Sequence, residues 1–295
     1  MRDGIVLIDK GQNLTSQAVV TRVKRLFGVD KAGHTGTLDP MATGVLPVLV
    51  GRGVKASEFM LSAEKHYEAE LTLGITSDTE DIWGEALTRS DAIPTEEDVM
   101  KILNRFRGEI LQTPPMYSAL KVGGKKLCDL ARSGMTVERV ARPITIYSLL
   151  ATRIDARRYT LDVHCSKGTY IRTLCADIGA ALGCGGVMSA LRRVEASGYT
   201  LTQTHTLEAI EAMTPETREE LILPVESVFA TWHTVVLAPF FARLAHSGLE
   251  IYQKKIGTSY PVGTRVRLYD QDGFFAVGEV RDYEGGSAIK PIRQF

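Results

Sequence analysis

The chain has 295 residues, 44% of them apolar and 24% charged, and 35 basic side chains balance 35 acidic ones, which argues against an indiscriminate polyanion binder. This length is sufficient to bury a sizeable core, while the apolar runs are far too short to span a bilayer. Because no export signal begins the chain and its four cysteines lack Cys-x-x-Cys spacing, we expect a cytoplasmic protein with reduced thiols, no membrane contact and no metal site.

Strands and helices alternate irregularly in the first third of the chain. Residues 4–9 are mostly apolar and predict a short buried strand. Apolar side chains on one face predict a helix over Ser16–Phe27, with Gly28 as its end signal. Residues 66–74 alternate apolar and polar side chains, which predicts a half-buried strand. The acidic residues at 94–98 are typical of the start of another helix.

The middle of the chain continues this mixture. Alternating apolar side chains predict a strand over residues 161–165, and a helical pattern follows over residues 171–182. Strands and helices therefore mix without a regular βαβ rhythm. This mixture favours the α+β class over a doubly wound parallel sheet.

The composition changes after Pro224. Residues 264–270 and 274–280 read as short strands, and the intervening Gln-Asp-Gly is a hairpin signal. We therefore predict a large domain over residues 1–231 and a small, mostly β domain over residues 232–295.

Charge is distributed unevenly around the middle of the chain. Residues 75–100 contain eight acids and one base, whereas residues 101–145 contain nine bases and three acids. A basic stretch beside an acidic one suits the docking of one particular RNA shape. Two solvated faces explain the same pattern, and charge alone favours that simpler interpretation.

The most informative segment is the loop at residues 33–44, which reads GHTGTLDPMATG. Its three glycines and one proline predict a backbone of fixed, irregular shape. Asp39 precedes Pro40, which disfavours the helical conformation at Asp39. We expect the loop to project this carboxylate into a cleft, although a lone Asp among glycines is more often a turn former. No Gly-Lys-Ser/Thr follows, so the loop is not a phosphate-binding P-loop.

This loop resembles the signature loop of the bacterial pseudouridine synthases that modify the T-arm uridine of tRNA at position 55. Six further motifs occur in that family's order. They read KHY, TSDTED, PPMYSALK, RPITI, CSKGTYIR and LRR, and begin at Lys65, Thr76, Pro114, Arg142, Cys165 and Leu191. The resemblance is close from residue 4 to about residue 200 and looser beyond.

The resemblance implies the pseudouridine synthase fold, an α+β fold with a central mixed, mainly antiparallel sheet flanked by helices. It also implies a small C-terminal, β-rich, PUA-like domain that binds RNA. The expected reaction breaks the N1–C1′ bond of the T-loop uridine, turns the uracil and joins C5 to C1′. Because no redox change and no group donor is involved, we expect no cofactor.

The resemblance assigns the catalytic carboxylate to Asp39. A carboxylate can attack C1′ or C6, or stabilise an oxocarbenium-like centre as glycosidase carboxylates do. Since a pocket that excludes water opposes ionisation of Asp39, a nearby cation is needed, and the resemblance places Arg172 beside it. From the residues alone, Arg172 would be a surface side chain on the first turn of a helix.

The target uridine is stacked inside the T-loop and must be flipped out to react. By resemblance, Tyr67 stacks on the flipped uracil, and Tyr170 and Leu191 form further walls of the pocket. From the residues alone, Tyr67 and Leu191 are equally suited to the hydrophobic core.

Three polar side chains complete the expected site. His34 is placed to enter the RNA stack in place of the flipped base, or else satisfies backbone groups of its own loop. Asp81 by resemblance interacts with Arg172 or with the flipped nucleotide. Lys10 is expected to support the active-site loop structurally.

The basic stretch is expected to bind phosphates of the tRNA T-arm, which gives affinity and salt dependence but little base specificity. Its members are Lys121, Lys125, Lys126, Arg132, Arg139 and Arg142. The chain lacks the basic tails of relatives that work in guide-RNA particles, so we expect a monomer without an obligatory protein or guide-RNA partner. It departs from the family at residues 11–16 and at Cys128, where a Tyr is common.

Three alternatives remain open at this stage. The enzyme could act on other RNA hairpins that mimic the T-loop. The protein could bind or fold tRNA, with its chemistry secondary. A glycoside hydrolase is a further alternative, and it would release free sugar or base.

Overall fold

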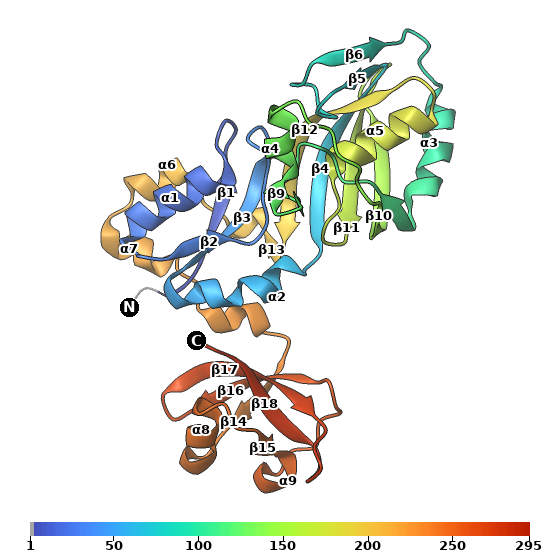
Figure 1. Cartoon of the computed structure of the whole chain (residues 1–295). Helices are drawn as coiled ribbons and strands as arrows, with labels where there is room; N and C mark the ends of the chain where they lie inside the picture. The colour runs from blue at the N-terminus through green and yellow to red at the C-terminus, as the bar shows by residue number, and fades with distance from the viewer. Residues whose placement is uncertain (1–2) are drawn as a thin grey trace.

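The computed structural model describes residues 3–295 (Figure 1). Most of these residues belong to a part of the molecule built on one large sheet. The strands of this sheet are β1 (Gly4–Lys10), β2 (Ala32–His34), β3 (Thr43–Val50), β4 (Lys65–Leu73), β7 (Gly108–Gln112), β10 (Arg142–Arg153), β11 (Arg158–Cys165), β12 (Gly186–Ala196) and β13 (Tyr199–Thr200). Their order is β1-β3-β12-β4-β11-β10-β7, and β2 and β13 pair with β3 and β12.

The large sheet is antiparallel except where β12 runs parallel to β3. The expected mixed, mainly antiparallel sheet is therefore confirmed. The register places Arg193 of β12 opposite Gly44 of β3 on one side and opposite Tyr67 of β4 on the other. Three chain segments that are far apart in sequence thus meet at one point of the sheet.

Short helices lie around this sheet and connect its strands, whereas the last two helices described belong to the C-terminal part (Figure 1). The α-helices are α1 (Ser16–Phe27), α2 (Ser57–Leu61), α3 (Glu96–Leu103), α4 (Leu127–Arg132), α5 (Ile171–Ala181), α6 (Leu207–Ala212), α7 (Pro215–Glu220), α8 (Pro239–His246) and α9 (Gln253–Ile256). Four 3₁₀ turns occur at Gly51–Ala56, Asn104–Phe106, Leu201–Gln203 and Val225–Phe229.

The helices predicted from periodicity are confirmed. Helix α1 spans the predicted residues, with the Thr15 side chain accepting from the backbone N–H of Ala18 and Gly28 in the left-handed conformation at φ 60°. Helix α3 begins after Thr95, which forms a capping box with Asp98. Helix α5 ends at Ala181, one residue earlier than the pattern suggested.

Strand β1 is buried on both of its faces, which explains its nearly continuous apolar sequence. Val6 and Ile8 belong to the main core together with α1 and the inner face of the large sheet. Ile5 and Leu7 point the other way, into a smaller core that contains Tyr199. The strand that leads to the candidate site is therefore fixed from two sides.

The C-terminal part forms its own five-stranded sheet in the order β14-β16-β17-β18-β15, and it has its own apolar core. Its strands are β14 (His233–Val236), β15 (Ile251–Tyr252), β16 (Arg265–Asp270), β17 (Gly273–Arg281) and β18 (Ala288–Gln294). The predicted hairpin is confirmed, because β16 and β17 pair from Asp270 and Gly273 outward. The domain division at residue 231 and the PUA-like character stay predictions.

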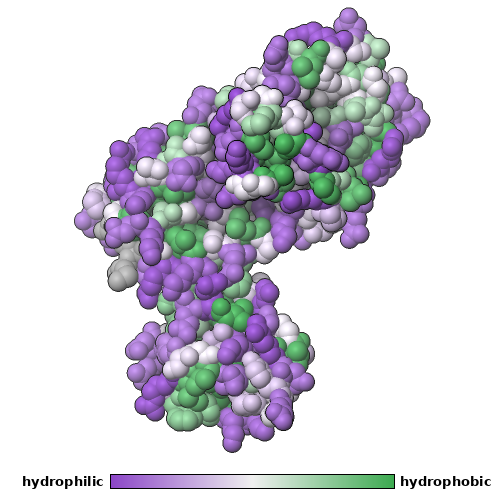
Figure 2. All heavy atoms as spheres, in the orientation of Figure 1, coloured by the Kyte–Doolittle hydropathy of each residue, from purple (hydrophilic) through white to green (hydrophobic). Residues whose placement is uncertain are grey.

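An aromatic cluster joins the two parts of the molecule. Phe229 lies at its centre and contacts the rings of Phe59, Trp232 and Phe295 at centroid distances of 5.2, 4.8 and 5.7 Å. Figure 2 shows the narrow waist between the two parts and hydrophilic residues over most of the visible face.

Two small two-stranded sheets project from the large sheet. One pairs β5 (Ile75–Ser77) with β6 (Ala86–Arg89), and the other pairs β8 (Lys121–Val122) with β9 (Lys125–Lys126). The first carries the acidic turn that reaches the candidate site. The second carries part of the basic stretch.

Candidate active site

The glycine-rich loop connects β2 to β3, which form an antiparallel pair. Its carboxylate-bearing residue, Asp39, begins a turn that a hydrogen bond of 3.1 Å from the Ala42 N–H to the Asp39 carbonyl closes. Both ends of the loop belong to the large sheet. The sheet therefore determines where the Asp39 side chain lies.

Two buried polar side chains hold the backbone on either side of Asp39. The Ser16 hydroxyl accepts from the Leu38 N–H at 2.8 Å, and its oxygen lies 3.0 Å from the Leu38 carbonyl, to which it donates. The Lys10 ammonium donates to the Pro40 carbonyl at 3.1 Å. This contact agrees with the expected structural role of Lys10 at the loop, which stays a prediction.

Arg193 supports the same loop from beneath. Its fully buried guanidinium donates to the carbonyls of Gly36 at 3.1 Å and Val45 at 2.8 Å, one before and one after Asp39. Gly44 has φ 103°, and a Cβ there would lie 2.2 Å from the Arg193 carbonyl oxygen. Only glycine permits this close approach of β3 to β12.

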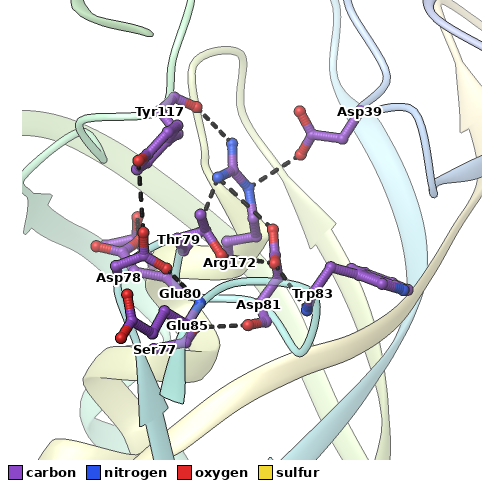
Figure 3. A network of polar contacts seen from close by, with 11 residues as sticks. Asp39, Ser77, Asp78, Thr79, Glu80, Asp81, Trp83, Glu85, Tyr117 and Arg172 are labelled. Atoms are coloured by element: carbon purple, nitrogen blue, oxygen red, sulfur yellow. Dashed lines mark hydrogen bonds and ion pairs between the residues drawn. The ribbon is translucent and has the colours of Figure 1, made fainter. Parts of the chain in front are cut away.

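Arg172 forms the expected ion pair with Asp39 (Figure 3). Its Nε lies 2.9 Å from Asp39 Oδ2, and its side chain is only 7% exposed. The remaining nitrogens donate to the carbonyls of Thr79 at 3.0 Å and Tyr117 at 2.7 Å. Arg172 is therefore a buried, oriented cation and not the surface residue of the simpler interpretation.

Asp81 is the second carboxylate near Arg172, since its Oδ2 lies 3.9 Å from Arg172 Nη1. Its other oxygen accepts from the Thr79 hydroxyl at 2.7 Å and from the Trp83 N–H at 3.1 Å. The expected contact of Asp81 with Arg172 is confirmed. A contact between Asp81 and a flipped nucleotide stays a prediction.

Tyr67 is almost fully buried next to the loop, and it lies opposite Arg193 in the β4–β12 ladder. Burial raises the pKa of the phenol above its ordinary value, and the Arg193 guanidinium partly opposes this rise. Tyr67 is thus in the core and beside the β2–β3 loop at once, so the two interpretations of this residue are not exclusive.

Tyr170 precedes helix α5 and is half-buried. The buried Gln112 side chain holds its backbone, accepting from the Tyr170 N–H at 2.8 Å and donating to the Tyr170 carbonyl at 3.1 Å. Leu191 of β12 is half-buried and packs against the main core. The stacking of Tyr67, Tyr170 and Leu191 on a uracil stays a prediction.

Two basic groups near the loop have lowered pKa values. Burial lowers the pKa of Lys10 to about 8, although the nearby Asp39 carboxylate raises it. Burial and the nearby Arg193 also lower the pKa of His34 below its ordinary value. His34 Nδ1 accepts from the Gly36 N–H at 3.3 Å, as the simpler interpretation expected, and insertion into RNA stays a prediction.

The expectation that Asp39 lies in a pocket that excludes water is wrong for the free protein. Its side chain is 40% exposed. Within residues 3–295, Asp39 Oδ1 has no hydrogen-bond donor, while Oδ2 is held by Arg172. One oxygen of the carboxylate is therefore fixed and the other is free to meet a substrate.

The basic stretch is exposed in most of its length. The side chains of Lys121, Lys125, Lys126, Arg132 and Arg142 are all exposed. Arg139 differs, because it is half-buried and its Nη1 donates to the Pro114 carbonyl at 3.0 Å. This contact helps to hold the backbone at Pro114, and phosphate binding by Arg139 stays a prediction.

Sequence reasoning gave no role at the site to Arg193, Gln112 or Ser16. The sequence did contain a signal for Arg193. Adjacent side chains on a strand point to opposite faces of the sheet, so either Arg192 or Arg193 must point inward. Arg192 indeed pairs with Asp9 at 2.8 Å while Arg193 is buried. Gln112 and Ser16 carried no such signal, since their bonds depend on segments distant in the sequence.

Among residues 3–295, no group of three His, Cys, Asp or Glu side chains is placed to hold a metal ion. Nor does any helix in this range have the length and apolar character needed to cross a membrane. Cys165 and Cys175 are fully buried, and burial raises the pKa of both thiols, to about 11 for Cys165. Their predicted role as small core residues is confirmed.

The geometry brings together one rigid carboxylate, one oriented guanidinium and a buried phenol. Such a set can stabilise positive charge at a sugar carbon or form a covalent bond to it. The fold matches that of a solved Cbf5-Nop10-Gar1 complex with a TM-score of 0.74 and 26% identity, covering 99% of this chain and 85% of that chain. The fold and the site define the class of pseudouridine synthases.

Comparison with known sequences identifies the family. Residues 24–171 match the N-terminal domain of the TruB family pseudouridylate synthases, and residues 172–230 match the C-terminal domain of tRNA pseudouridylate synthase B. The chain is 42% identical to tRNA pseudouridine synthase B of Azoarcus sp. (strain BH72), with 99% of this chain and 94% of that protein covered. The protein of the same name from Clostridium tetani is 38% identical, with 98% and 99% covered. The chain belongs to the TruB family of pseudouridine synthases and is an isomerase.

Proposed function

We propose that this enzyme isomerises the T-loop uridine at position 55 of tRNA to pseudouridine, with Asp39 as the catalytic residue. The observation that carries the proposal is the Asp39–Arg172 pair on the stiffened β2–β3 loop. The relatives named tRNA pseudouridine synthase B support tRNA as the substrate. We further propose that the enzyme acts as a monomer without a guide RNA or protein partner, in the cytoplasm where tRNA is found.

The reaction is a balanced rearrangement. The N1–C1′ bond breaks with its electron pair on N1, C5 bonds to C1′, the C5 proton leaves, and N1 gains a proton. The free oxygen of Asp39 either bonds to C1′ or C6 or stabilises the cationic sugar, while Arg172 fixes the other oxygen. The base stays in the pocket throughout, so no second carboxylate is needed to activate water.

The pocket residues supply orientation. Tyr67 and Tyr170 offer aromatic faces to the flipped uracil, and one stacked ring is worth about 1–3 kcal/mol. Leu191 closes the opposite side. His34 lies on the same loop as Asp39, has a lowered pKa, and fills the gap that the flipped base leaves in the RNA stack.

Affinity comes from outside the pocket. The exposed cations of β8, β9, α4 and β10 provide phosphate contacts with the T-arm, and their effect depends on salt. These cations are Lys121, Lys125, Lys126, Arg132 and Arg142. The C-terminal sheet extends the contact along the tRNA.

The proposal is tested with purified protein and unmodified tRNA labelled with tritium at C5 of uridine. We expect tritium release that Asp39→Asn abolishes, while binding to a T-arm hairpin stays within about tenfold, or ~1.4 kcal/mol. Release by Asp39→Asn would exclude Asp39 as the catalyst. Mapping of pseudouridine across total RNA separates tRNA from other hairpins, and free uracil or sugar among the products would indicate a hydrolase.

A further inference from the structure

Trp83 is an exposed aromatic residue beside the candidate site, and none of the roles above uses it. Its side chain is 44% exposed. Within residues 3–295, its indole makes no stacking contact with another ring and no hydrogen bond. An exposed indole without a partner in the fold is a candidate ligand contact. A ligand that covers this large apolar surface removes it from water, which favours binding.

The backbone of Trp83 belongs to the polar network of the active site. Its N–H donates to Asp81 Oδ1 at 3.1 Å, Asp81 Oδ2 lies 3.9 Å from Arg172 Nη1, and Arg172 holds Asp39. Figure 3 shows the indole extending from the Asp81 turn on the side of Arg172 where Asp39 lies. Through Asp81 and Arg172, the backbone of Trp83 is thus connected to the carboxylate that we propose acts on the uridine.

The turn that carries Trp83 is rigid. The Ile82 N–H donates to the Met188 carbonyl at 2.9 Å, and the Met188 N–H donates to the Glu80 carbonyl at 3.1 Å. These bonds attach the turn to β12 immediately before and after Asp81. The backbone that carries the indole is thus ordered before RNA binds, so little backbone entropy is lost when a ligand contacts this turn.

The charges around Trp83 select the kind of contact. Glu80 accepts from the Thr173 hydroxyl, and Asp81 is paired with Arg172, so both carboxylates already have partners within the protein. No cation of the turn is available for a phosphate, since residues 77–85 contain only acidic charges. An apolar ring in this setting suits the face of a base and not the RNA backbone.

We propose that Trp83 is a stacking platform for an unstacked nucleobase that flanks the target uridine in the substrate RNA. The inference rests on the proposed function and adds a second base-binding subsite to it. A base extruded together with the uridine loses its stacking partners in the loop, and the indole replaces them.

Steady-state tritium release tests the role in binding. We expect Trp83→Ala to raise KM for a T-arm hairpin about tenfold, which corresponds to about 1.4 kcal/mol, with a smaller effect on kcat. Trp83→Phe retains a ring and should restore most of the loss. Leu87→Ala is the matched control, because Leu87 is 62% exposed on the same two-stranded sheet and should leave KM unchanged.

Tryptophan fluorescence reports the stacking directly. The chain has two tryptophans, and the other one, Trp232, lies in the aromatic cluster between the two parts of the molecule. In a Trp232→Phe background, titration with the hairpin should quench the Trp83 emission and shield it from iodide. Unchanged emission and unchanged iodide access at saturating RNA would overturn the proposal.

An abasic scan identifies the partner base. We expect removal of one base next to the target uridine to raise KM for the wild type and to abolish the difference between wild type and Trp83→Ala. The slope of affinity against salt should be equal for both proteins, because stacking releases no counterions. Additive effects at every abasic position would refute the subsite, whereas a wild type inactive on all T-arm RNA would refute the proposed function instead.

Discussion

Replacement of Arg172 by Lys keeps the positive charge and removes the planar fork. In the native protein, the fork reaches Asp39 Oδ2 at 2.9 Å and the carbonyls of Thr79 and Tyr117 at 3.0 and 2.7 Å. One ammonium cannot meet all of these acceptors, because they lie in different directions from the guanidinium plane. We expect Arg172→Lys to lose the contacts to the two carbonyls and to leave Asp39 less well oriented.

The size of the effect follows from burial. A hydrogen bond from a charged donor contributes about 1.5–3 kcal/mol to the free energy of unfolding. The variant loses the two bonds to the carbonyls, and new contacts of the lysine compensate in part. The expected net loss is therefore about 2–4 kcal/mol. The contact with the 40% exposed Asp39 adds only about 1 kcal/mol because solvent screens it. Displacement of the carboxylate by about 1 Å lowers kcat on the order of 100-fold.

Urea unfolding measures the loss in free energy of unfolding, and single-turnover tritium release measures the decrease in the rate of the chemical step. Arg158→Lys serves as the control, since Arg158 pairs with Asp155 at an exposed position and its replacement should change neither. If folded Arg172→Lys retained kcat within about threefold of the wild type, orientation of Asp39 by the guanidinium fork would not be required. The reasoning from the geometry of the pair would then fail.

Three further predictions concern the surroundings of this pair. Burial lowers the pKa of Lys10 from 10.5 to about 8. Between pH 8 and pH 10.5, the folded protein therefore holds fewer protons than the unfolded chain. The contribution of Lys10 to the free energy of unfolding consequently rises with pH across this window. Because deprotonation removes a cation near Asp39, we expect kcat/KM to fall above pH 8. In Lys10→Gln this fall should be absent. The same fall of kcat/KM in the variant would show that another group causes it. Gln112→Ala leaves the Tyr170 N–H without its acceptor, while the Tyr170 carbonyl keeps its bond from the Leu174 N–H. We expect about 1–3 kcal/mol lower unfolding free energy and a higher KM, with unchanged KM as the contradicting result. Replacement of Lys125 and Lys126 by Ala should weaken all RNA ligands alike and reduce the salt slope by about one to two units, whereas a loss confined to one RNA sequence would contradict phosphate binding.

Local signals in the sequence were sufficient for the elements that carry the site. The cap and stop signals of α1 and the alternation of β4 depend on residues close in sequence, and both elements were predicted correctly. The loop around Asp39 was recognised because glycine and proline restrict its backbone directly. Patterns of this kind are local, and a single chain displays them in full.

Contacts between distant segments could not be predicted in the same way. The hydrogen bonds from Gln112 to Tyr170 and from Arg193 to Gly36 join residues 58 and 157 positions apart. Periodicity says which face a side chain occupies, and not which carbonyl it meets. The exposure of Asp39 was also unpredictable, since it depends on the packing of several segments around the loop.

Hydrogen bonds hold the β2–β3 loop to Ser16, Lys10 and Arg193. They determine which molecule must change conformation when the enzyme binds its substrate. The entropy lost in ordering this loop is incurred during folding, long before any encounter. Deformation on binding then falls to the RNA. Substrates whose loops open readily should accordingly react faster than tightly folded ones, at equal phosphate contact.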